Sequence, residues 1–157
     1  MSDVDIEHKF WKAVKADRTV MVGTAKVPPR PMTLLLDPDV AKTGWIFTSR
    51  QNELLVGMKA KIDAQAAFAS KGHDVFASIL GTLSIHNDRA EIDRLWNPFV
   101  AAWFKDGKDD TDLVLLRFDM DSAEIWSDAS SAIAGLKIIL GVDPKADYSK
   151  KVTNVEF

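Results

Sequence analysis

TVMVGTAKVPPRPMTLLL, which spans residues 19–36, is the stretch of this sequence that decides the fold class. Its first part, residues 19–25, is rich in β-branched side chains, which is typical of a β-strand. Pro28 and Pro29 cannot donate ladder hydrogen bonds, so the strand must end in a turn before them. Residues 30–36 return to an apolar pattern. The stretch therefore predicts two strands joined by a sharp turn.

More elements are predicted on both sides of this pair. A helix capped by Ser2 is expected to run to about Ala16, because apolar residues recur there at helical spacing. Turn residues at 37–39 and Gly44 precede a third extended segment at 45–48. The first three strands are therefore expected to form a meander.

The remaining strands are predicted from short apolar runs bounded by turn residues. They are expected at 63–69, 75–87, 113–118 and 123–126, with an edge strand or a loose terminus at 152–157. The runs at 113–118 and 123–126 are expected to be two strands around a turn at Asp121-Ser122. Gly81 lies in the middle of its run, which predicts a bulge or a close backbone approach.

Three further helices are predicted, from Glu53 to Ala60, from Ile92 to Trp103 and from Ser131 to Leu140. The first follows Asn52, a good capping residue. The second contains Asn97-Pro98, which predicts either a kink or a new helix capped by Asn97. Six or seven strands with few helices, and no regular strand–helix alternation, predict an antiparallel barrel or sheet of the α+β class. We expect a single domain over residues 1–157.

Composition excludes several classes of function. The chain has 157 residues and no cysteine, which excludes thiol catalysis, disulfide scaffolds and thiolate metal sites. With 20 Lys and Arg against 23 Asp and Glu, mixed along the chain, there is no basic stripe for nucleic acid. No apolar run is long enough to span a membrane, and the acidic start does not resemble a signal peptide. A cytoplasmic location is expected.

The sequence lacks the motifs of several other kinds of site. His8, His73 and His86 share no metal-binding spacing, so no metal site is expected. The common nucleotide-loop and hydrolase motifs are absent from the sequence. The helical spacing of Trp96 and Trp103 favours a core or subunit-contact role over a ligand cage.

The polar strand ends are the best candidates for a ligand site. Arg30 follows the proline turn, and Thr48, Ser49 and Arg50 follow Phe47 at the end of the third strand. Such residues suit a phosphate or the polar edge of a heteroaromatic ring, because Arg binds oxyanions bidentately and hydroxyls are adaptable donors.

At these residues the sequence resembles the FMN-binding split-barrel proteins related to pyridoxamine 5′-phosphate oxidase, most closely the general stress protein branch. The resemblance covers nearly the whole chain. It rests on the order of the leading helix, residues 19–25, Arg30-Pro31-Met32, residues 45–49, residues 75–81, Leu95-Trp96-Asn97-Pro98, residues 101–104, and Ala123-Glu124-Ile125-Trp126.

The resemblance implies a split-barrel homodimer with FMN, or FAD, in a groove between the subunits. The cofactor-binding residues it implies are Arg30, Pro31, Met32, Thr33, Phe47, Thr48, Ser49 and Trp126.

The sequence departs from the family pattern where the flavin phosphate is expected to bind. Related proteins commonly have a basic residue shortly after the Phe-Thr-Ser strand end, where this chain has Gln51-Asn52-Glu53-Leu54-Leu55. Arg50, which is included among the expected cofactor-binding residues, Lys59 and Lys61 are the candidates for that place; if none of them takes it, FMN binds weakly or another ligand replaces it.

Three functional hypotheses remain open. In the leading one the chain is a flavin-binding general stress-type protein, with an oxidoreductase role in which the bound flavin transfers hydride or electrons. Its catalytic residues and its small-molecule electron donor or acceptor are not specified by the sequence. The second hypothesis is a non-catalytic carrier of a flavin or another flat anion. The third is a dimeric stress protein without a ligand.

Overall fold

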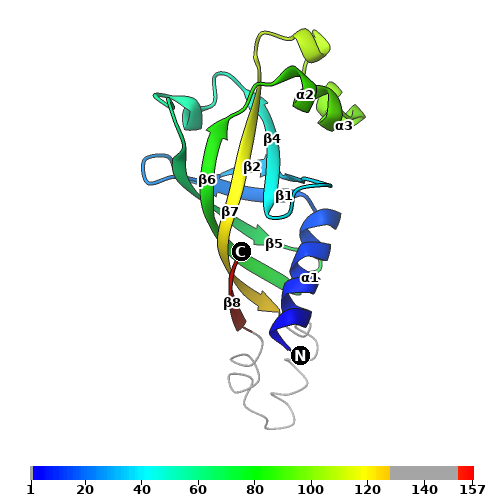
Figure 1. The fold of residues 1–157 in the computed structure, drawn as a ribbon, viewed down its shortest axis with the longest axis vertical. Coiled ribbons are helices and arrows are strands. Elements are labelled where there is room, and N and C mark those ends of the chain that lie inside the picture. The colour runs from blue at the N-terminus through cyan, green and yellow to red at the C-terminus, as the bar shows by residue number, and fades with distance from the viewer. Residues whose placement is uncertain (1, 128–151) are drawn as a thin grey trace.

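The computed structural model describes residues 2–127 and 152–157 of the chain. In this part a curled antiparallel sheet wraps around the larger of two buried hydrophobic clusters, with the N-terminal helix lying along it (Figure 1). The helix predicted from Ser131 to Leu140 lies outside the described residues. None of the described helices is both long and apolar enough to cross a membrane.

The helices and strands have the following bounds. The helices are α1 Asp3–Ala16, α2 Arg89–Leu95 and α3 Pro98–Ala101, with 3-10 turns η1 Glu53–Leu55 and η2 Gly107–Asp109. The strands are β1 Thr19–Gly23, β2 Arg30–Thr33, β3 Leu35–Leu36, β4 Thr43–Ser49, β5 Ile62–Ala69, β6 Val75–Ile85, β7 Leu113–Ser127 and β8 Val152–Glu156.

The sheet order is β2-β1-β5-β6-β7-β4-β3, and β8 pairs with β7 beside this path. This confirms the predicted α+β antiparallel split barrel. Of the two expectations for residues 152–157, an edge strand or a loose terminus, the edge strand is confirmed as β8. The pairing of the predicted meander is confirmed, since β2 pairs with β1 and β3 pairs with β4. Its second strand, residues 30–36, is divided at Leu34, whose backbone N–H donates to the Arg18 carbonyl, and β4 also pairs with β7.

Helix α1 begins and ends as the sequence predicts. The Ser2 hydroxyl accepts a hydrogen bond from the Asp5 N–H, and the Asp5 carboxylate accepts from the Ser2 backbone, which completes a capping box. Ile6, Phe10 and Val14 are fully buried against the sheet. The helix ends at Ala16, and Asp17 and Arg18 connect it to the start of β1.

Strand β7 is continuous over fifteen residues, so the prediction of two strands around a turn at Asp121-Ser122 is wrong. The predicted irregularity at Gly81 is confirmed, and it explains why no turn forms. Leu80 pairs with Ser122 and Gly81 pairs with Met120, so Asp121 is an extra, unpaired residue that forms a bulge within a continuous β7. A Cβ at Gly81 would collide with the Asp119 carbonyl oxygen.

Two predicted helices are shorter in the structure. The pattern from Ile92 to Trp103 is broken after Leu95, and a new short helix begins at Pro98. Its cap is the Asn97 side chain, which accepts from two backbone N–H groups, so the second of the two expectations holds. The helix expected from Glu53 is reduced to one 3-10 turn, and Gly57 adopts a positive φ of 73° shortly after it.

A buried ion pair fixes α2 against the turn between β3 and β4. The Asp37 side chain has no exposed surface and lies 2.7 Å from the Arg94 guanidinium. The Trp45 indole N–H also donates to this carboxylate, at 2.7 Å, and the Asp39 and Val40 backbone N–H groups donate to it as well. Burial alone would raise the pKa of Asp37, but these hydrogen bonds outweigh it and hold the pKa well below its ordinary value.

Candidate ligand-binding groove

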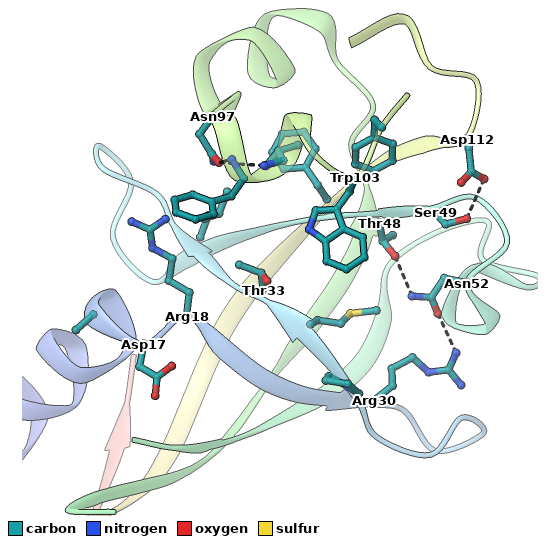
Figure 2. A pocket seen from close by; sticks show the side chains of 18 residues that line it. Asp17, Arg18, Arg30, Thr33, Thr48, Ser49, Asn52, Asn97, Trp103 and Asp112 are labelled. Carbon is teal, nitrogen blue, oxygen red and sulfur yellow. Dashed lines mark hydrogen bonds between the residues drawn. The ribbon is translucent and has the colours of Figure 1, made fainter. Parts of the chain in front are cut away.

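A groove of about 810 Å³ lies beside β2 and the end of β4, within the size range of small-molecule sites (Figure 2). It is lined by Ala16, Asp17, Arg18, Arg30, Pro31, Met32, Thr33, Leu35, Phe47, Thr48, Ser49, Asn52, Asn97, Phe99, Val100, Trp103, Phe104 and Asp112. Segments far apart in the sequence therefore meet here: the end of α1, two strands, and the α3 region.

A chain of hydrogen bonds organises one end of the groove (Figure 2). The Asn52 amide N–H donates to the Thr48 hydroxyl oxygen at 3.0 Å, and its carbonyl oxygen accepts from the Arg30 guanidinium at 3.3 Å. The same oxygen accepts from the Leu54 backbone N–H, which ties the chain to η1. Asn52 therefore holds Thr48 and Arg30 in fixed positions on the groove wall.

The two neighbouring hydroxyls of β4 differ in what they can offer a ligand. The Ser49 hydroxyl donates to Asp112 at 2.8 Å and accepts from the Gln51 backbone N–H. Thr48 accepts from Asn52, and within the described part of the chain its hydroxyl hydrogen has no acceptor. Thr48 is therefore the hydroxyl donor available to a bound molecule.

The opposite end of the groove carries a second cation. Asp17 follows the last residue of α1, and Arg18 precedes β1. Figure 2 places Arg18 and Arg30 on opposite sides of the groove, with Thr33 and Trp103 between them. The groove therefore has an arginine on each of two sides.

Aromatic side chains form the remaining wall. Phe47 is half-buried and meets Trp96 edge to face, with ring centroids 5.9 Å apart. Phe99 and Trp103 are 77% and 85% exposed, although both line the groove. Helical spacing had favoured a core or subunit-contact role for this stripe. The break at Asn97 turns its second half out of the core and onto the rim.

Seven of the predicted site residues line the groove together: Arg30, Pro31, Met32, Thr33, Phe47, Thr48 and Ser49. Arg50 does not, because its guanidinium donates to the Thr111 carbonyl oxygen at 3.0 Å. Lys61 lies 3.8 Å from Asp119, and neither it nor Lys59 lines the groove. The groove residues that the sequence did not predict include Arg18 and Asn52, whose places depend on long-range packing.

Trp126 also lies outside the groove, on the outer face of the sheet, where it is opposite Phe76. This face carries several exposed apolar side chains. Met21, Phe76 and Leu80 are each 39–51% exposed on it, together with the small residue Ala67. Since Pro31 lies opposite Met21, the apolar face borders the groove directly.

The fold is a split barrel with a groove at one end of its sheet, and comparison with known proteins agrees. The chain matches the family described as pyridoxamine 5′-phosphate oxidase like, over residues 5–146. It belongs to this family, which confirms the resemblance found in the sequence. No curated protein matches the chain.

Several solved structures of general stress proteins are similar. One from Xanthomonas campestris pv. campestris is 49% identical, with a TM-score of 0.74, and the match covers 82% of this chain and 92% of that one. The general stress FMN/FAD binding protein of Xanthomonas citri is 47% identical, with a TM-score of 0.76 and the same coverage. A general stress protein 26 from Jannaschia sp. CCS1 is 27% identical over 99% of this chain and all of that one, with a TM-score of 0.77.

Proposed function

We propose that this chain is a cytoplasmic, homodimeric flavin-binding protein of the general stress type, and that FMN occupies the groove between β2 and α3. The observation that carries this proposal is the groove itself: a flat aromatic and apolar wall with a guanidinium and a free hydroxyl at one end. The 47% identity to an FMN/FAD binding protein supports the choice of ligand.

The chemistry of the groove fits a flavin. Phe47, Phe99 and Trp103 offer ring surfaces to a tricyclic ring, and Thr48 offers a donor to its polar edge or to the ribityl chain. Arg30 has further donor capacity, since its Nε is buried and has no partner among the described residues. Arg30 is therefore the residue we assign to the phosphate.

The protein's contribution is to bind and orient the flavin. When bound, a flavin supplies hydride or electron transfer. The titratable side chains that line the groove in the described part of the chain are Asp17, Arg18, Arg30 and Asp112. Asp112 accepts a hydrogen bond from Ser49, and Arg30 is paired with Glu53. No general acid or base is assigned.

A titration of FMN into the purified protein, followed by quenching of flavin fluorescence, tests the binding proposal. Saturable quenching supports it, and unchanged fluorescence contradicts it in favour of a ligand-free stress protein. Turnover of reduced nicotinamide by the flavin-loaded protein then separates an oxidoreductase from a carrier. FAD and riboflavin belong in the same titration, because the proposal names FMN as the preferred flavin.

The apolar face beside the groove supports the proposed homodimer. An exposed apolar patch of this kind is typical of an interaction surface, and a second copy seated on it would close the open side of the groove. Trp126 lies on this face, so we propose that the flavin contact implied for it is made by Trp126 of the partner subunit.

We expect Ala67→Glu to convert the dimer into a monomer of 17.4 kDa, because it places a charge in the middle of the apolar face. Light scattering at micromolar concentration measures the mass. Ala41→Glu, in the exposed turn before β4, is the matched control and should remain a dimer. A wild-type mass of one chain would contradict the homodimer.

A further inference from the structure

Arg30 is the groove cation that we assign to the phosphate, and it already has an anionic partner. Its guanidinium lies 2.9 Å from the Glu53 carboxylate and 3.3 Å from the Asn52 carbonyl oxygen. Arg30 and Asn52 line the groove, whereas Glu53 does not. The guanidinium therefore stands between the groove and an acidic side chain behind it.

In the Arg30–Glu53 ion pair, a ligand anion can replace the carboxylate at low cost. The Glu53 side chain is 70% exposed, while that of Arg30 is 29% exposed. An ion pair with so exposed a partner contributes little to stability. The carboxylate can turn into solvent while the Asn52 carbonyl oxygen still accepts a hydrogen bond from the guanidinium.

We infer that Glu53 is a specificity-determining residue, which acts through Arg30 to reduce the preference of the groove for a phosphorylated flavin over an uncharged one. This inference rests on the proposed function. A phosphate carries nearly two negative charges at neutral pH, so it must compete with Glu53 for the guanidinium. Riboflavin has no phosphate and meets no such competition.

The test compares FMN with riboflavin by calorimetry in wild type and in Glu53→Gln. The amide keeps the size of the side chain and removes its charge. We expect Glu53→Gln to bind FMN roughly threefold to tenfold more tightly and riboflavin within about twofold of wild type. Asp63→Asn, an exposed carboxylate outside the groove, controls for the change in net charge and should alter neither affinity.

A second variant tests the route through Arg30. In an Arg30→Gln background the Glu53→Gln change should no longer affect FMN, because the shared partner is gone. Equal tightening of both flavins, no tightening of either, or an effect that persists without Arg30 overturns the inference and leaves flavin binding intact. Failure of wild type to bind either flavin overturns the proposed function, and the inference with it.

Discussion

Arg30→Ala is expected to weaken FMN binding by roughly 30- to 150-fold, which corresponds to ~2–3 kcal/mol for the loss of a charge-assisted contact to the phosphate. This loss of binding free energy is larger than that for an exposed contact, because Arg30 is largely shielded from water and held by Asn52. Stability should fall by less than about 1 kcal/mol, since its partner Glu53 is mostly exposed. A fluorescence titration and a thermal melt measure the two effects.

Arg89→Ala is the matched control for Arg30→Ala. Arg89 is also a partly exposed, ion-paired arginine, but it lies on α2 and does not line the groove. Its replacement should leave FMN affinity within about twofold of wild type. A large loss at Arg50 instead of Arg30 would place the phosphate beside the Thr111 loop and contradict the assignment made here.

Asp37→Ala is expected to lower the free energy of unfolding by about 2–3 kcal/mol, since it leaves the Trp45 indole N–H and two backbone N–H groups without their acceptor and removes one of the carboxylates paired with Arg94, which keeps Glu91. Urea unfolding followed by tryptophan fluorescence measures the change. Asp39→Ala is the matched control. Asp39 also lies near Arg94, at 3.7 Å, but its side chain is 79% exposed, so less than about 0.5 kcal/mol should be lost. Equal effects of the two variants would contradict the role of Asp37.

The low pKa of the Asp37 carboxyl also makes the stability of the fold depend on pH. The pKa of Asp37 is lower in the folded protein than the ordinary value of about 3.9. Its contribution to stability is therefore fully present above about pH 4 and is lost as the pH falls further through the folded pKa. Unfolding free energies measured between pH 3 and pH 6 should fall less steeply at the acid end in Asp37→Asn than in wild type. Parallel curves would exclude this carboxylate as a source of acid sensitivity.

Local patterns predicted the parts of the fold that depend on local chemistry. The capping box of α1 and the prolines before β2 act within a few residues of one another, and both were correctly interpreted. The pairing of β4 with β7 could not be predicted, because it joins residues more than sixty positions apart. The polar Asp121-Ser122 pair of β7 favoured a turn, but Asp121 is accommodated as a bulge opposite Leu80 and Gly81 of β6, a pairing that the local sequence of β7 does not show.

The groove was predictable to a similar extent. Arg30 and Thr48 lie at strand ends and have side chains that suit a phosphate or a polar ring edge, so local chemistry was enough to select them. Asn52 was recognised as a helix cap, and its bridge from Thr48 to Arg30 appears only when β2 and β4 are placed side by side. Trp103 was assigned to a core or a subunit contact because the break at Asn97 could not be distinguished from a kink.

Native mass spectrometry of the wild-type protein with added FMN reports the number of chains and the bound ligand together. We expect a species of two chains carrying two FMN molecules, and we expect Ala67→Glu to lose both the second chain and the flavin. A wild-type spectrum that shows single chains, or dimers to which no flavin binds, would contradict the claim that a flavin occupies a groove shared by two copies.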